Sequence, residues 1–246
     1  MKFSVVTEQG KVRAQNQDFV FTTDQPVGSL PNLFLVADGM GGHNAGEYAS
    51  EYTIKAVLDE IRSHKELSPI ATMEKAITQA NQIIHDRAVN DADKSGMGTT
   101  LVAATFVDGH IYVANVGDSR LYINTCDELK QITRDHSLVE ELVREGTVSE
   151  NVARRHPKKH MITRAIGAES HIRTDFFDVT LSETDQILMC TDGLTNMVED
   201  DDIRRILNDS CDLKTKVHTL VDTANANGGK DNITVVVIEP YSDEEM

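Results

Sequence analysis

The chain has 246 residues, enough for one large domain, and its formal net charge is −16 at pH 7. This charge argues against nucleic acid and anionic membrane surfaces, which attract cationic side chains, so we expect neither as a partner. The three cysteines, Cys126, Cys190 and Cys211, are too few and scattered for a disulfide framework, which predicts a reducing, cytoplasmic compartment. The expected oligomeric state is a monomer. No stretch has the length and apolar content of a signal peptide or a bilayer span.

The first third of the chain predicts strands followed by helices. A strand is predicted at 19–21, and the apolar run 33–37 predicts a second, buried strand that ends at a glycine-rich turn. Helices are predicted over 45–62 and over 70–84, where apolar residues recur every three or four positions.

Short strands dominate the rest of the chain, at 100–107, 110–116, 120–124, 129–133, 176–179, 186–190 and 233–238. The first two form a hairpin at Asp108-Gly109, the next two continue it, and 176–179 pairs with 186–190. Helices are predicted at 201–208 and 214–226. The expected fold is α+β, a four-layer α-β-β-α sandwich of two antiparallel sheets flanked by helix pairs. We expect one domain over 1–241 and a short acidic tail at 242–246.

Five aspartates lie at the edges of predicted strands, beside turns or loops: Asp18, Asp38, Asp118, Asp192 and Asp231. One Asp-Gly pair is usually only a turn. Five carboxylates converging in one domain would repel one another unless cations neutralised them. Oxygen ligands favour Mg²⁺ or Mn²⁺ over zinc, and two such ions can lower the pKa of a shared water toward neutrality.

Other phosphate chemistries lack their required residues. A cysteine nucleophile needs an arginine six residues later, where this chain has Ile132, Asn196 and Val217. No P-loop motif is present. The segment 91–96 resembles the start of a calcium loop, but its twelfth position is Val102 instead of glutamate.

Two basic features suit a phosphate ligand. Arg13 precedes Asn16-Gln17-Asp18, where its planar side chain can bind phosphate oxygens or form a surface ion pair. The segment 146–164 carries the most basic stretch of the chain, 154–160. That segment is either a solvated loop or a mobile flap that attracts an anionic substrate.

Seven short motifs then occur in a specific order: Arg13-x-x-Asn16-Gln17-Asp18, Asp38-Gly39-Met40-Gly41-Gly42-His43, Gly98-Thr99-Thr100, Gly117-Asp118-Ser119-Arg120, Thr163-Arg164-Ala165-Ile166-Gly167, Asp192-Gly193-Leu194 and Gly229-Lys230-Asp231-Asn232. Each motif is weak alone, but the ordered set resembles the metal-dependent serine/threonine protein phosphatases of type 2C, in their compact bacterial form. The resemblance covers nearly the whole chain. It implies a β-sandwich flanked by helix pairs, with two Mn²⁺ or Mg²⁺ ions at one end and a third, weaker site.

The resemblance also implies roles for individual residues. Asp38 bridges the two ions, the Gly39 carbonyl binds the first, and Asp192 and Asp231 bind the second. Asp118 binds the third ion together with Asp192.

Further roles concern water, phosphate and substrate. Asp18 holds a metal-bound water and Arg13 binds the phosphate. The flap residues Gly146, Arg154 and His156 are expected to contact the substrate.

The general acid stays open. Animal members of the family have a histidine, proposed as this acid, where the present chain has Met40. His43 is then a candidate catalytic residue, and a local hydrogen-bonding role at a helix start is its alternative. A metal-bound water or a flap histidine, His156 or His160, can serve instead.

The predicted activity is hydrolysis of phosphoserine and phosphothreonine in proteins by direct attack of water, opposing a bacterial serine/threonine kinase. Phosphorylated proteins are the expected partners, together with that kinase. One alternative is an inactive relative that binds phosphoproteins, which the presence of all five aspartates disfavours. Another is the same centre acting on a small phosphoester.

Overall fold

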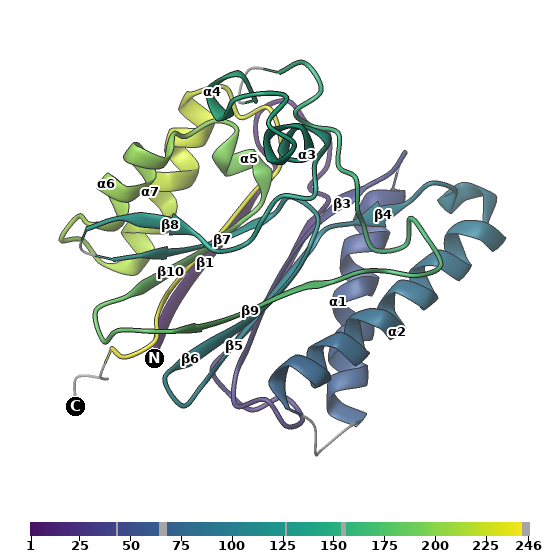
Figure 1. Ribbon diagram of the computed structural model, residues 1–246, viewed down its shortest axis with the longest axis horizontal. Coiled ribbons are helices and arrows are strands. Elements are labelled where there is room, and N and C mark those ends of the chain that lie inside the picture. The colour runs from purple at the N-terminus through teal and green to yellow at the C-terminus, as the bar shows by residue number, and fades with distance from the viewer. Residues whose placement is uncertain (43, 64–67, 126, 154–155, 243–246) are drawn as a thin grey trace.

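The computed structural model describes residues 1–42, 44–63, 68–125, 127–153 and 156–242. Two antiparallel sheets pack face to face, and helices cover their outer faces (Figure 1). The strands are β1 (Lys2–Glu8), β2 (Asp18–Thr23), β3 (Leu33–Met40), β4 (Gly98–Thr99), β5 (Leu101–Val107), β6 (His110–Val116), β7 (Arg120–Asn124), β8 (Leu129–Gln131), β9 (Asp175–Thr180), β10 (Gln186–Cys190) and β11 (Ile233–Glu239).

The helices fall into two groups that cover the sheets and one group near the sandwich end. They are α1 (Ala45–Ser63), α2 (Pro69–Asn90), α3 (Leu138–Arg144), α4 (Glu150–Ala153), α5 (Asp192–Thr195), α6 (Asp200–Leu207) and α7 (Leu213–Ala226), with a 3₁₀ turn at Ala92–Lys94. One sheet has the order β2-β3-β5-β6-β9, with β4 paired to β3, and the other has the order β1-β11-β10-β7-β8.

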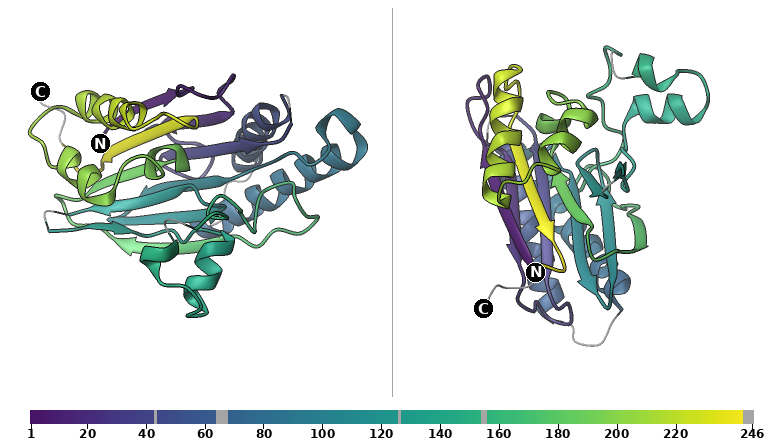
Figure 2. Two further views of the ribbon diagram at one scale, coloured as in Figure 1. Left: turned by 90° about the horizontal axis from the view of Figure 1, so that it is seen from above. Right: turned by 90° about the vertical axis from the view of Figure 1, so that its left-hand side faces the viewer.

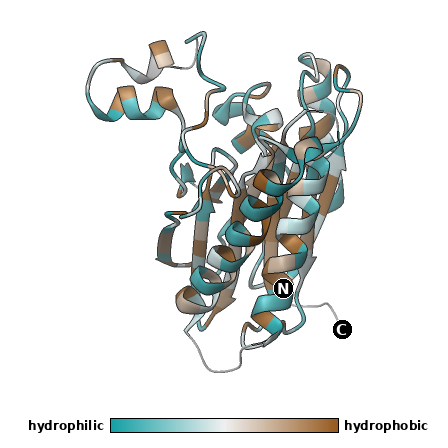
Figure 3. Cartoon of the chain, turned by 90° about the vertical axis from the view of Figure 1, so that its right-hand side faces the viewer, coloured by the Kyte–Doolittle hydropathy of each residue, from teal (hydrophilic) through white to brown (hydrophobic). Residues whose placement is uncertain are grey.

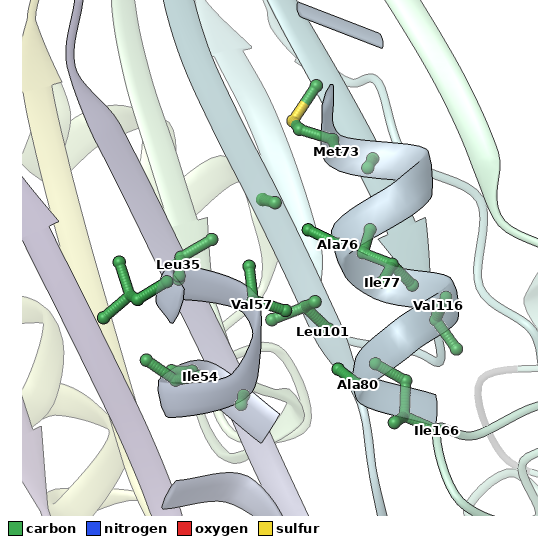
Figure 4. Packing of buried hydrophobic residues seen from close by; sticks show 14 of the residues in the cluster. Leu35, Ile54, Val57, Met73, Ala76, Ile77, Ala80, Leu101, Val116 and Ile166 are labelled. Carbon is green, nitrogen blue, oxygen red and sulfur yellow. The ribbon is translucent and has the colours of Figure 1, made fainter. Parts of the chain in front are cut away.

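Alternation along the strands produces three apolar layers. In β3, Leu33, Leu35 and Ala37 face the helices α1 and α2, while Phe34 and Val36 face the other sheet. Figure 4 shows the first of these layers, where side chains of α1 and α2 meet those of β3, β5 and β6. A strand that is apolar on both faces fits only a central layer, which explains the continuous apolar run.

The second sheet repeats this arrangement. Val235 and Val237 of β11 pack toward α6 and α7, whereas Val236 and Ile238 pack between the sheets. Brown apolar segments concentrate on the strands and the inner sides of the helices in Figure 3. Burial of apolar surface stabilises the fold by roughly 25 cal/mol per Å². The three layers together therefore hold the strand ends in place.

The structure confirms the predicted fold class and the hairpin at Asp108-Gly109, where both residues have positive φ. It corrects two pairings. Strand β7 does not continue the β5–β6 hairpin but lies in the other sheet, and β9 and β10 do not pair, because they also belong to different sheets. The chain crosses between sheets at 117–119 and 181–185. Local apolar alternation carries no information about which sheet a strand joins.

The segment 137–162 contains α3 and α4 and projects from the sandwich (Figure 2). It begins earlier than the flap predicted at 146–164, and the name flap is used for 137–162 from here on. Strand β1 and the small helices α3, α4 and α5 were not predicted. In the described ranges, we find no helix with both the length and the apolar content to cross a bilayer. The predicted acidic tail lies largely outside the described residues, and the domain boundary at 241 stays a prediction.

Candidate metal centre

A cavity of about 530 Å³ lies at one end of the sandwich, where several strands of both sheets finish. In Figure 1 this is the end marked by α5 and β4. The cavity is lined by four of the five predicted aspartates together with basic, amide and apolar side chains: Arg13, Gln17, Asp38, Gly39, Met40, Gly41, Thr100, Asp118, His160, Ile162, Asp192, Gly193, Asn196, Met197, Lys230, Asp231 and Asn232.

Strand register brings the first two aspartates together. Asp18 of β2 stands directly opposite Asp38 of β3, so their side chains lie on the same face of the sheet. Val36 of β3, two residues before Asp38, packs between the sheets, and the two carboxylates therefore face the second sheet. Two hydroxyls from the side of that sheet contact one of them: Thr191 and Thr234 donate hydrogen bonds of 2.8 and 2.7 Å to Asp18 Oδ2.

The backbone of Asp38 is fixed by the neighbouring Gly98-Thr99-Thr100 motif. Its N–H donates to Thr100 Oγ1 at 2.9 Å, and its carbonyl accepts from Thr99 Oγ1 at 2.8 Å. Gly39 follows, and a Cβ there would lie 2.0 Å from the Gly46 carbonyl oxygen, so only glycine fits where β3 meets α1. A carboxylate is thus held at a rigid strand end.

A second close approach unites Asp192 and Asp231. A Cβ on Gly193 would lie 1.9 Å from the Asn232 carbonyl oxygen, so the start of α5 rests against the loop before β11. Asn196 donates to Asp192 Oδ2 at 2.8 Å, and the Asn232 N–H donates to Asp231 Oδ1 at 2.9 Å. Each carboxylate is therefore oriented by a neighbour in its own segment.

Asp118 lies at the point where the chain leaves β6 in one sheet and enters β7 in the other. Gly117 has φ +104°, and a Cβ there would lie 2.6 Å from Thr100 Cβ, so the turn is tight against β5. The sequence predicted an aspartate at a strand end. The change of sheet explains why this aspartate reaches the space between them.

Burial and mutual repulsion disfavour the ionised aspartates. Burial raises the pKa of Asp18 to about 7, although the two threonine hydroxyls favour its carboxylate form. Burial and the charge of Asp192 raise the pKa of Asp118 to about 8, and burial with Asp231 raises that of Asp192 to about 6. Burial and then Asp18 raise the pKa of Asp38 well above its usual range. Such a group of acids stabilises positive charge.

The donor set fits a hard cation. Asp18 Oδ1 and Asp192 Oδ1 are buried and accept no hydrogen bond. Buried carboxylate oxygens normally have partners, so both oxygens suit a cation or its bound water. Within the described ranges, no three His, Cys, Asp or Glu side chains meet closely enough to enclose an ion alone. The carboxylates instead border a shared cavity, which suits Mg²⁺ or Mn²⁺ ions that keep several waters.

Arg13 lies at the cavity edge and is half exposed. Its Nη2 donates to Asp231 Oδ2 at 2.6 Å, and this hydrogen bond is the main cause that raises the Arg13 pKa. The guanidinium thus neutralises one aspartate and also borders the open cavity, where an anionic ligand would meet it.

The predicted flap residues are placed less uniformly. His160 lines the cavity, and burial lowers its pKa, as do the neighbouring cations. Gly146 and His156 line neither this cavity nor its neighbour, so the structure does not bring these two predicted substrate contacts to the site. The other two predicted residues, His43 and Arg154, lie outside the described residues.

A second hollow of about 410 Å³ adjoins the cavity, and Asp118, Asp192 and Asn196 border both. Flap residues such as Val139 and Lys159 form its outer wall. Sequence reasoning did not identify the hydroxyl and amide groups that orient the carboxylates, namely Thr191, Thr234 and Asn196. Their only sequence signal is proximity to Asp192 or Asp231, and threonine within a strand is too common to stand out.

Comparisons with known proteins agree with this geometry. The family model described as Protein phosphatase 2C matches residues 8–233. The serine/threonine phosphatase stp of Listeria welshimeri is 40% identical, and the match covers 95% of this chain and 93% of that protein. The crystal structure of the Mycobacterium tuberculosis serine/threonine phosphatase PstP/Ppp matches with a TM-score of 0.87 and 33% identity, covering 96% of this chain and 97% of that one.

A further structure is described as the catalytic domain of the serine threonine protein phosphatase PstP in complex with two manganese ions. It matches with a TM-score of 0.83 and 32% identity, covering 96% of each chain. These matches confirm the resemblance and the enzyme class predicted from the motifs. The chain belongs to the protein phosphatase 2C family.

Proposed function

We propose that this protein hydrolyses phosphoserine and phosphothreonine in phosphorylated proteins, using two Mn²⁺ or Mg²⁺ ions and a third, weaker one. The observation that carries the proposal is the convergence of five aspartates from five segments of the chain: four line one cavity, and Asp18 stands opposite one of them, Asp38. The unpartnered oxygens of Asp18 and Asp192 support it, because they lack the hydrogen bonds that a purely structural carboxylate would make.

In this proposal Asp38, Asp192, Asp231 and the Gly39 carbonyl hold the two main ions, and Asp118 with Asp192 holds the third. When bound, the cations supply charge that offsets the phosphate and a water of lowered pKa. The two threonine hydroxyls keep Asp18 Oδ2 occupied, so Oδ1 is left to orient a water beside Asp38. The manganese ions of the PstP structure support this cation class.

Arg13 binds the phosphate oxygens, which requires its guanidinium to serve Asp231 and the substrate together. The reaction is a direct displacement. Water loses a proton and forms a bond to phosphorus while the bond between phosphorus and the serine or threonine oxygen breaks; the leaving oxygen takes up a proton, and the products are the free hydroxyl side chain and inorganic phosphate. His160 borders the cavity and is the described flap histidine nearest to that role, but its lowered pKa favours the neutral ring, so it donates the proton better at acidic than at neutral pH.

The names of the relatives support protein-bound phosphoserine and phosphothreonine as the substrate class. By the same analogy the enzyme acts in the cytoplasm and reverses a serine/threonine kinase on shared protein targets. The strongly negative charge makes nucleic acid a poor alternative ligand.

The test measures phosphate release from a phosphothreonine peptide and an aryl phosphate, with Mn²⁺, with Mg²⁺ and with excess chelator. We expect turnover with either metal and its loss with chelator. Acid quenching during turnover of a ³²P-labelled peptide should yield no labelled protein, and a covalent phosphoprotein would refute direct attack. Absence of hydrolysis under every metal condition would favour the phosphoprotein-binding alternative.

A further inference from the structure

His136 lies buried at the base of the flap, just after β8, with 6% of its surface exposed. Two hydrogen bonds join it to Gly117, the residue before Asp118. The Gly117 N–H donates to His136 Nδ1 at 3.0 Å, and the His136 N–H donates to the Gly117 carbonyl at 3.0 Å. The position of the Asp118 turn therefore depends on both the ring and the backbone of this histidine.

The contacts define the proton on the ring. Because a backbone N–H can only donate, Nδ1 must be the bare nitrogen, and in the neutral ring Nε2 carries the proton. Nε2 lies 3.2 Å from Asp175 Oδ2. Arg164 Nη1 is also close, at 2.9 Å, but its two protons have acceptors in Asp175 Oδ1 and the Arg173 carbonyl. Nε2–H is thus left to donate to Asp175.

The same histidine joins the two ends of the flap. The Thr163 N–H donates to the His136 carbonyl at 2.8 Å, and the Leu138 N–H donates to the Met161 carbonyl at 2.8 Å. Ser137 and Ile162 form an isolated antiparallel bridge between these bonds. A displacement of the flap stem is therefore transmitted to Gly117 through one residue.

The other side of the turn is tied to the Asp38 strand pair. Ser119 Oγ lies 2.7 Å from Thr100 Oγ1, the same atom that accepts the Asp38 N–H. Asp118 is consequently held between two anchors. One is Thr100 in the sheet, and the other is His136 at the flap base.

We propose that His136 is a positioning residue for Asp118: by accepting the Gly117 N–H it sets the distance between Asp118 and Asp192, and so the affinity for a divalent cation between them. The proposal rests on the proposed function for its cation class. His136 borders neither hollow, so it acts through the backbone and contacts neither phosphate nor ion.

Two amide substitutions test the roles of the two ring nitrogens one at a time. In His136→Asn, the amide oxygen can take the place of Nδ1 and still accept the Gly117 N–H. In His136→Gln, the longer amide reaches the place of Nε2 and can donate to Asp175, but the acceptor for Gly117 is lost. His110→Asn is the matched control, because His110 is a partly exposed histidine that pairs with Asp178 and lies outside the lining of both hollows.

The readouts are Mn²⁺ binding to the full chain, followed through the electron paramagnetic resonance of free Mn²⁺, and kcat and KM at saturating Mn²⁺. We expect His136→Gln to weaken the weakest Mn²⁺ site about tenfold and to lower kcat more than KM changes. His136→Asn should stay within about threefold of the wild type, as expected when a hydrogen-bond acceptor is retained.

An independent readout uses the Mg²⁺-loaded protein. The backbone amide of Gly117 should keep its ¹H–¹⁵N shift in His136→Asn and move upfield in His136→Gln. The proposal would be overturned if His136→Asn, His136→Gln and the control His110→Asn bound Mn²⁺ equally well. Equal losses of affinity in His136→Asn and His136→Gln would overturn it too. If the wild type bound no Mn²⁺ at all, the proposed function would fail and so would this inference. A wild type that binds Mn²⁺ but is inactive would overturn the proposed function and leave this inference standing.

Discussion

The strand-end cavity and the flap meet at the same place but are built differently. Asp18 begins β2 and Asp118 directly follows the crossover residue after β6, and each is at least nine-tenths buried. Among the flap residues whose burial the structure describes, only Ser137 and Val139 are buried. The cavity is therefore held by the sandwich, whereas the flap is held mainly by its stem. This difference separates chemistry, which needs fixed groups, from substrate contact, which tolerates motion.

The difference between cavity and flap predicts that a substitution at the strand end has the largest effect on activity. Asp38→Asn should lower kcat by about a hundredfold or more, because a neutral amide no longer offsets bound cations. The fold should survive, since the Asp38 backbone bonds to Thr99 and Thr100 are retained. The measurements are steady-state kinetics with Mn²⁺ and thermal unfolding, with Asp59→Asn on α1 as the control. Near-normal turnover would show that Asp38 holds no catalytic cation.

A smaller effect is expected at the cavity edge. Arg13→Ala should lower kcat/KM for a phosphopeptide by about tenfold, the usual scale for losing one charge-assisted hydrogen bond. Arg62→Ala is a matched control, because Arg62 is similarly exposed and pairs with Asp59 on α1. If both variants behaved alike, Arg13 would be only a partner of Asp231.

Substitutions in the flap should weaken the binding of large protein substrates more than they slow the chemical step. Val152 and Met161 expose 56% and 50% of their surfaces, and contact with a protein substrate would bury them. Replacing both by serine should raise KM for a phosphoprotein by about fivefold while aryl phosphate turnover stays within about twofold. Val89→Ser, an exposed valine on α2, is the control. An equal loss on both substrates would contradict the division between cavity and flap.

The smallest effect is a shift of stability with pH. Without metal, the raised pKa values of Asp18, Asp118 and Asp192 mean that the folded protein binds more protons than the unfolded chain. Their contribution is complete below the unfolded pKa of 3.8 and is lost as pH rises through about 6 to 8. In chelator, the melting temperature should therefore be a few degrees higher at about pH 6.5 than at about pH 8.5.

Saturating Mn²⁺ should reverse this order, because cations bind the ionised carboxylates and stabilise the folded state more at the higher pH. Calorimetry at both pH values, with and without Mn²⁺, gives the four melting temperatures. A metal-free protein that melts lower at the lower pH would contradict the repulsion among these aspartates.

Much of the cavity could be predicted because its aspartates directly follow apolar strands. Asp38 and Asp192 fall at the ends of β3 and β10, where an apolar run stops, and such ends gather at the edge of a sheet. The same reasoning could not assign β7 or β10 to a sheet, since each strand is buried on both faces and many pairings satisfy that pattern.

His136 was missed for a different reason. Its role depends on a hydrogen bond to Gly117, 19 residues away, across a change of sheet. No local pattern marks a histidine whose partner is a backbone N–H. The flap helices were missed because they have only seven and four residues, too few to show the repeated apolar periodicity of α1 and α2.

Strand β1 pairs along its whole length with β11, so that Lys2 lies opposite Glu239. Arg13 and Asp231, which form an ion pair, follow and precede these two strands. During synthesis, β1 therefore cannot pair with β11 until all the strands and helices between them have been made. A nascent or truncated chain lacking β11 therefore has an incomplete sheet and an incomplete cavity.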